Sequence, residues 1–287
     1  MRKYIINIVV GLLLIGLGIC IYSGIQANSA EEVKPQRSIQ EIIEAFKNPD
    51  WEVRCDALDE ITEFHPDIVN EKGCWPLKKE YDCKPIRDAL ITLFKDEFHG
   101  EGAPGEGYAE YYCGVVYTVV GLRDPRSFPE IMEVYGLTVA LDCAAEIAGK
   151  KEVEKLLQDL NKGEEHEVNH ALKIFVRMIG NKKALYKPTE KEKQRIGDAV
   201  ETAILRFPPP KEGEIWYDVK MYRSSMTLYG IQIIGKLEDV RKIPLLKMIS
   251  TSKEYKKYKG QRFGREQIEP LEEAKKVLAQ LQQRKKK

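Results

Sequence analysis

Apolar residues recur every three or four positions along most of this chain, which is the spacing that gives an α-helix one buried face. Val53, Ala57, Leu58 and Ile61 form such a face. The pattern predicts helices over 38–47, 51–61, 85–98, 108–120, 124–135, 137–148, 152–160, 164–179, 189–207, 215–234, 239–249 and 267–283. It predicts no strand, so the sequence indicates an all-α protein.

One segment of the chain recurs. The stretch 120–131 and the stretch 234–246 each contain the end of a helix, a glycine, a short turn with Asp and Arg, and a second helix that includes a proline. Fainter copies begin at Ile147 and Ile179. The turn glycines are Gly121, Gly149, Gly180 and Gly235, so the steps are 28, 31 and 55 residues. The first two steps suit a repeat of one helix pair, and the third suits a longer unit or one with an insertion.

The segment Asn48–Leu58, NPDWEVRCDAL, resembles the turn and second helix of a HEAT repeat. The pattern Gly-x-x-Asp-Pro-Arg-x-x-Pro at 121–129 is similar to the turn and first helix of the same family. In that family Asp and Arg tie successive turns together, while Val, Ala and Leu fill the core. The resemblance implies a right-handed αα superhelix of about six helix pairs, preceded here by an N-terminal apolar helix. It also implies a concave binding surface along the second helices.

The first thirty residues carry an export pattern. A basic start at Arg2 and Lys3 precedes a mostly apolar run over 4–22, which is about long enough to span a membrane. Small residues over 27–30 suit cleavage by a signal peptidase. This pattern fits both a cleaved signal peptide and an uncleaved membrane anchor. Either one predicts that the remainder lies outside the cytoplasm, at the outer face of the membrane if anchored or in the periplasm or medium if cleaved.

The predicted organisation is therefore a signal peptide or anchor over 1–30, a linker over 31–37, a HEAT-like repeat domain over 38–284 and a basic tail over 285–287. The net charge of +1 argues against a general nucleic-acid binder. Charge is nevertheless uneven, because 38–72 holds ten acidic and three basic residues whereas 253–287 holds five and twelve. Such polarity can steer a charged partner, although two solvated faces would give the same counts.

One motif suggests metal chemistry. His166-Glu167-Val168-Asn169-His170 matches the zinc-protease pattern His-Glu-x-x-His, which places two ligands one helical turn apart beside a general base. The repeat frame already explains Val168 and the following Ala-Leu, and the apolar lead-in of zinc proteases is missing. No third ligand follows at a diagnostic spacing. We therefore expect no cofactor, and a zinc-dependent hydrolase using His166 and His170 is the alternative.

Five cysteines lie beyond the apolar segment. Export would place them in an oxidising compartment, and Cys74 and Cys83 share one predicted loop, so a disulfide between them is plausible. Cys55, Cys113 and Cys143 lie on predicted helices among apolar residues, which is typical of buried thiols.

The favoured function is a non-enzymatic protein-binding scaffold or adaptor of the cell envelope that uses its concave surface. The expected partner is another protein, and an acidic one would suit the basic and aromatic segment over 253–265. The membrane is a second partner if the N-terminal helix is retained, and nucleic acid is not expected. The residues proposed to bind the partner are Tyr117, Tyr217, Arg223, Lys256, Lys257 and Arg262.

Overall fold

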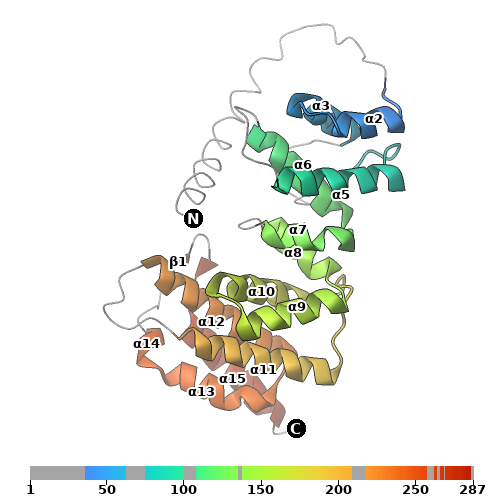
Figure 1. The fold of residues 1–287 in the computed structure, drawn as a ribbon. Helices are drawn as coiled ribbons and strands as arrows, with labels where there is room; N and C mark the ends of the chain where they lie inside the picture. Colours follow the sequence, from blue (N-terminus) through green and yellow to red (C-terminus); the bar gives the residue numbers. More distant parts are fainter. Residues whose placement is uncertain are drawn as a thin grey trace. The chain divides into compact units, whose positions relative to one another are not determined.

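The computed structural model describes residues 36–62, 75–99, 108–134, 138–208, 217–256, 262–263, 266–267 and 269–285, and these are almost entirely helical. The described chain forms two compact units, one ending at Leu122 and the other beginning at Arg123 (Figure 1). The all-α prediction is confirmed. The predicted N-terminal apolar helix lies outside the described residues.

The first unit contains α2 (Ile39–Phe46), α3 (Trp51–Ile61), α5 (Lys84–His99) and α6 (Tyr108–Leu122). Ser38 and Glu41 form a capping box at the start of α2, since each side chain accepts a hydrogen bond from the backbone N–H of the other. Helices α2 and α3 pack together, as do α5 and α6, and the pairs meet through α2 with α5 and α3 with α6. Each helix pair therefore covers an apolar face of the other.

The second unit is longer. In chain order it contains η1 (Pro125–Ser127), α7 (Phe128–Glu133), α8 (Thr138–Ile147), α9 (Lys150–Lys162), α10 (Glu165–Met178), α11 (Glu190–Arg206), α12 (Tyr217–Leu237), η2 (Val240–Lys242), α13 (Ile243–Thr251), α14 (Lys253–Lys256), β1 (Arg262–Phe263), β2 (Glu266–Gln267) and α15 (Pro270–Lys285). The hairpin of β1 and β2 pairs Arg262 with Gln267 and Phe263 with Glu266. This hairpin is a small exception to the expectation of no strand. The four-residue helix α14 lies between 249 and 267, where the sequence predicted no helix.

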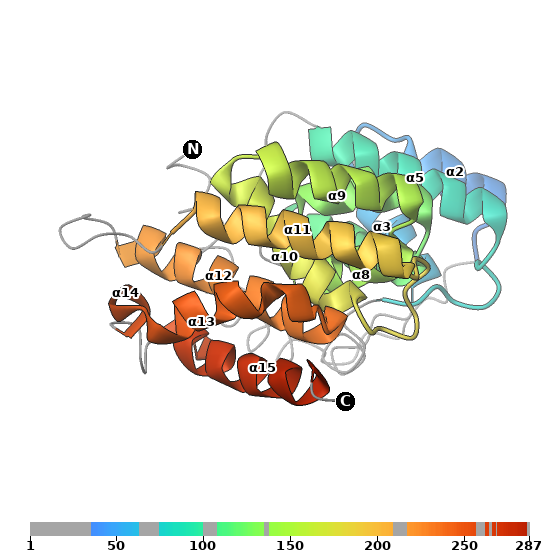
Figure 2. The same cartoon turned by 90° about the horizontal axis from the view of Figure 1, so that it is seen from below.

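Within this unit the helices form two layers. Helices α7 and α8, α9 and α10, α11 and α12, and α13 and α15 are packed pairs, and each pair contacts the next (Figures 1 and 2). Helices α9 and α11 lie side by side in what we call the first layer. Helices α8, α10, α12 and α15 contact one another in that order in what we call the second layer. Helix α8 is largely buried, and its Ala140, Cys143, Ala144 and Ala145 are almost inaccessible.

The two close sequence copies fold into the same turn. Arg123 (φ 52°) and Glu238 (φ 59°) adopt the left-handed conformation directly after a helix. The next residue in each copy, Asp124 or Asp239, caps a 3₁₀ turn by accepting a hydrogen bond from the backbone two residues on. A helix with proline in its first turn then begins. The same left-handed residue, Asp-capped 3₁₀ turn and first-turn proline therefore lead into both α7 and α13.

The repeat glycines Gly149, Gly180 and Gly235 have different structural roles. Gly149 precedes α9 with an ordinary negative φ, and its backbone N–H donates to Glu152 at 3.0 Å. Gly180 follows α10 with φ +82°, a conformation that glycine adopts without steric cost. Gly235 lies inside α12, where an added Cβ would meet Val277 of α15 at 3.0 Å, so it permits close helix packing. The glycines thus share a spacing but not a single role.

Candidate protein-binding surface

Helix α10 presents two contrasting sides. Val168, Ala171, Leu172 and Phe175 are completely buried. The residues 166, 170, 173 and 177 follow a spacing of four, three and four along another side, where every side chain is basic. Along this row His166 is exposed, Lys173 and Arg177 are half-buried, and His170 is buried. Periodicity therefore separates a packing side from a polar side of the same helix.

The polar side of α10 continues onto its two neighbours in the second layer. On α8, Asp142 accepts a hydrogen bond from Nε of Arg177 at 2.9 Å. On α12, the ammonium of Lys236 donates to the backbone carbonyl of Val176 and lies close enough to Arg177 for the two charges to interact. Residues 229, 232 and 236 of α12 share one side at helical spacing. We call this surface, made of Asp142, Glu146, His166, His170, Lys173, Arg177, Gln232 and Lys236, the α10 face.

Ion pairs hold the second layer in register. Arg223 of α12 makes a two-pronged contact with Glu165 of α10, with Nε to Oε1 at 3.0 Å and Nη2 to Oε2 at 3.2 Å. Arg123 pairs with Glu146 of α8 at 3.2 Å. The pair of Arg223 with Glu165 joins α12 to α10, and the pair of Arg177 with Asp142 joins α10 to α8, so charge as well as apolar packing links these helices.

The first layer is tied together in the same manner. Arg195 of α11 holds Glu154 of α9 through two hydrogen bonds of 2.8 and 2.7 Å. Lys242, almost wholly buried at 5 % exposure, donates to Asp198 at 2.5 Å and to Glu201 at 2.6 Å on α11. Burial alone would lower the pKa of Lys242, but the two carboxylates outweigh it and the pKa is raised.

The first unit contains a comparable cluster. Glu97 of α5 accepts hydrogen bonds from Tyr111 of α6 at 2.9 Å and lies 2.7 Å from Nε of Arg54 of α3. The guanidinium of Arg54 also donates to the carbonyls of Asn48 and Pro49. Burial raises the pKa of the Tyr111 phenol, so the phenol stays protonated. The cluster joins three helices through matched charges, which is a structural role.

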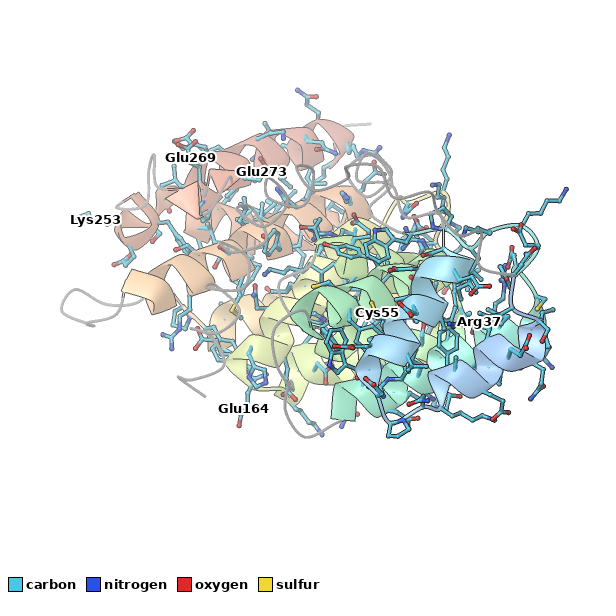
Figure 3. All side chains as sticks on the ribbon, turned by 90° about the horizontal axis from the view of Figure 1, so that it is seen from above. Arg37, Cys55, Glu164, Lys253, Glu269 and Glu273 are labelled. Atoms are coloured by element: carbon cyan, nitrogen blue, oxygen red, sulfur yellow. The ribbon has the colours of Figure 1, made fainter. Side chains whose placement is uncertain are left out.

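The residues of the zinc-protease pattern serve different purposes. The carboxylate of Glu167 closes a capping box by accepting from the backbone N–H of Glu164 at 2.7 Å. His166 is exposed, and Glu164 points away from the helices beside it (Figure 3). His170 is 6 % exposed, and burial, followed by the charges of Lys173, Arg177 and His166, lowers its pKa to about 4. The described residues contain no group of three or more His, Cys, Asp or Glu side chains arranged to hold a metal ion.

Of the six binding residues predicted from the sequence, the structure describes the side chains of Tyr117 and Arg223. Tyr117 belongs to the first unit, where its ring lies 6.2 Å from that of Trp75 and burial raises its pKa. Arg223 is engaged with Glu165, as described above. The side chains of Tyr217, Lys256 and Arg262 lie outside the described part of the chain, as does the whole of Lys257.

The cysteines are described in part. Cys143 is fully buried, as predicted, while Cys55 (labelled in Figure 3) and Cys113 are half-buried. Cys83 is also half-buried. Cys74 lies outside the described residues, so the disulfide between Cys74 and Cys83 stays a prediction.

Most of the α10 face has only a weak signal in the sequence. Lys173, Arg177 and Lys236 lie on helices that are otherwise nearly all buried, where a polar residue every three or four positions is the available signal. That spacing is present in 166–177, where it includes both histidines of the His-Glu-x-x-His pattern. A pairing such as Asp142 with Arg177 joins positions 35 residues apart, and only the fold reveals it.

Searches with this chain against family models, curated proteins and solved structures return no match. Among the described residues, no helix combines the length and the apolar character needed to cross a membrane.

Proposed function

We propose that this chain is a non-enzymatic scaffold that binds another protein at the α10 face, built as a HEAT-like α-solenoid. The observation that carries the proposal is the order of contacts in the second layer, where α8, α10, α12 and α15 follow one another. The duplicated turn before α7 and α13 supports it, because repeated local geometry is what a solenoid of helix pairs requires. A right-handed superhelix of about six pairs across the whole chain is part of this proposal.

The proposed location is the cell envelope. Support comes from the sequence alone, namely the basic start, the apolar run over 4–22 and the small residues over 27–30. Retention of that run would tether the protein to the outer face of the membrane, and cleavage would release it.

The proposed binding uses a surface whose shape exists before the partner arrives. The ion pairs of Arg223 with Glu165 and of Arg177 with Asp142 join neighbouring helices of the second layer. A face fixed in this way loses little conformational entropy when a partner docks, so more of the contact free energy appears as affinity. This is the mechanism that we propose for recognition.

The alternative, a zinc-dependent hydrolase, fits the geometry less well. Glu167 is bound to the helix end, whereas a general base must reach the metal-bound water. Lys173 and Arg177 also act on His170 electrostatically, and their positive charge would oppose a zinc ion there. These two observations favour binding over catalysis.

Photo-crosslinking in intact cells tests the proposal. A photoreactive amino acid replaces Gln232, half-buried on the second-layer helix α12, or Gln158, exposed on the first-layer helix α9. We expect a discrete adduct from position 232 and none from position 158. Adducts of equal yield at both positions, or none at either, would overturn the assignment of the surface.

Metal analysis of the purified protein tests the alternative. We expect substoichiometric zinc that does not change on His170→Ala. One zinc per chain that is lost on this substitution would replace the scaffold with the hydrolase.

A further inference from the structure

The first and last helix pairs of the described chain, α2 with α3 and α13 with α15, keep apolar side chains exposed. On α2, Ile39 is 38 % exposed and Ile43, one turn later, is half-buried. Along η2 and α13, Val240 is 39 % exposed and Met248 is 49 % exposed, with the exposed Pro244 midway between them. A spacing of four residues places such side chains on one side of a helix. We call these two surfaces the α2 stripe (Ile39 and Ile43) and the α13 stripe (Val240, Pro244 and Met248).

Helices α9 and α11, which belong to inner pairs, have a different surface. Every exposed residue of α9 is polar, and α11 exposes a single apolar residue, Leu205 in its last turn. An inner pair of a stack is covered by the pair before it and the pair after it, whereas an end pair lacks one of the two. The two stripes are therefore the places where a further helix pair would pack.

The two end pairs carry opposite charge. Residues 36–62 hold seven acidic and three basic residues, whereas 240–256 and 270–285 together hold three acidic and nine basic ones. Of these nine, Arg241 and Lys242 are already engaged with Asp198 of α11, which leaves seven. The excess is thus negative at the α2 end and positive at the α13 end.

Some of these charges are exposed and make no ion pair with another described residue. At the acidic end they are Glu52 and Asp56 of α3. At the basic end they are Lys247 of α13 and Lys253 of α14, the latter labelled in Figure 3. Complementary charges of this kind attract two surfaces and fix the way in which they meet.

We propose that copies of this chain associate end to end, with α2 and α3 of one copy packing on α13 and α15 of the next. Pairs inside the chain already pack in this manner, because α2 contacts α5, α3 contacts α6, α9 contacts α11 and α12 contacts α15. A second copy extends the same arrangement, with α2 on α13 and α3 on α15. The contact covers both apolar stripes and brings Glu52 and Asp56 to the basic end.

The proposed contact joins two different ends, so a dimer keeps one free end of each kind and further copies can add. Opposite charge favours this contact over a symmetric dimer, in which two acidic or two basic ends would meet. The end pairs share no residue with the α10 face. The inference therefore goes beyond the proposed function and does not depend on it.

Sedimentation velocity of the full chain, purified in a density-matched detergent, tests the inference. Ile39→Asp blocks the α2 stripe and Met248→Asp blocks the α13 stripe, because each substitution places a carboxylate where an apolar contact would form. Leu185→Asp is the matched control, since Leu185 is 61 % exposed in the segment between α10 and α11 and belongs to neither end pair.

We expect the unaltered chain to form dimers and larger species as its concentration rises. Ile39→Asp should raise the dissociation constant about fivefold and Met248→Asp about tenfold, the latter more because its carboxylate meets the acidic end. The control should stay within about twofold of the unaltered chain. A chain that stays monomeric over the whole concentration range, or equal effects of the three substitutions, would overturn the inference.

Mixing the two end variants separates an end-to-end contact from a symmetric one. Each variant keeps one intact end, so an equimolar mixture should form a dimer and nothing larger, which also shows that both variants remain folded. High salt should weaken association of the unaltered chain, because it screens the charges of the two ends. Failure of the mixture to associate, a defect in Met248→Asp with none in Ile39→Asp, or association that strengthens with salt would each contradict the proposal.

Discussion

Lys242 and Lys236 lie only six residues apart in sequence, yet the fold treats their charges in opposite ways. Lys242 is buried between two carboxylates of α11, and its pKa is raised. Lys236 lies on α12 in the second layer and donates a hydrogen bond to a backbone carbonyl. Its pKa is lowered, first by burial and then by the charge of Arg177. The charge of Lys242 is matched by carboxylates inside the fold, whereas that of Lys236 lies beside a carbonyl and the like charge of Arg177.

The largest effect should come from breaking the matched side of this comparison. Lys242→Met leaves Asp198 and Glu201 without their shared cation, and because both carboxylates are partly exposed we expect a loss of about 2–3 kcal/mol of unfolding free energy. Urea denaturation measures it. Lys247→Met, an exposed position on α13, serves as the control and should change stability by less than about 0.5 kcal/mol. Equal effects of the two substitutions would mean that the buried cluster has no special role.

The α10 face makes a prediction about pH. His170 titrates at about 4 in the folded chain, below the ordinary value of 6.5, so between these values the unfolded chain binds more protons. Stability should therefore fall as pH falls from 6.5 toward 4, and His170 should account for about 2 kcal/mol between pH 7.5 and pH 5. Comparing urea unfolding of the unaltered chain and His170→Gln at both pH values measures this. A loss of the same size in the variant would assign the effect to other groups.

The two copies of the turn sharpen the comparison further. Asp124→Ala and Asp239→Ala each remove a cap, with an expected cost of about 1 kcal/mol. Asp239 should cost more, because it also orients Arg241, which donates to the carbonyl of Gln194 at 3.0 Å and reaches Asp198 of α11. Thermal unfolding of both variants ranks them. A larger cost at Asp124 would show that the tie to α11 contributes nothing.

The smallest effect should lie on the exposed side of the first layer. Arg195→Ala removes the pair with Glu154, in which both side chains are almost half exposed, so we expect a loss of no more than about 0.5 kcal/mol. Urea denaturation at low and high salt checks this. A loss above about 1.5 kcal/mol would contradict the expectation that this exposed ion pair contributes little to stability.

The sequence predicted those features that depend on neighbours along the chain. The helix over 51–61, the burial of Cys143 and the equivalence of the Asp124 and Asp239 turns all follow from residues within one or two helical turns. The spacing alone could not distinguish Gly149, which precedes a helix, from Gly180, which adopts positive φ.

The candidate surface was harder to predict for a physical reason. Arg223 is a half-buried cation on a helix, and its sequence context does not reveal that Glu165, 58 positions earlier, already holds it. Long-range pairing determines which charges are matched inside the fold. The pairs of Arg177 with Asp142 and of Arg223 with Glu165 are visible only in the structure.

Photo-crosslinking in intact cells from Gln232 of α12 and from Gln158 of α9 tests most directly the central claim that the second layer binds and the first layer supports. The account predicts a discrete adduct from position 232 and none from position 158. An adduct from position 158 that matches or exceeds the yield at position 232 would contradict it.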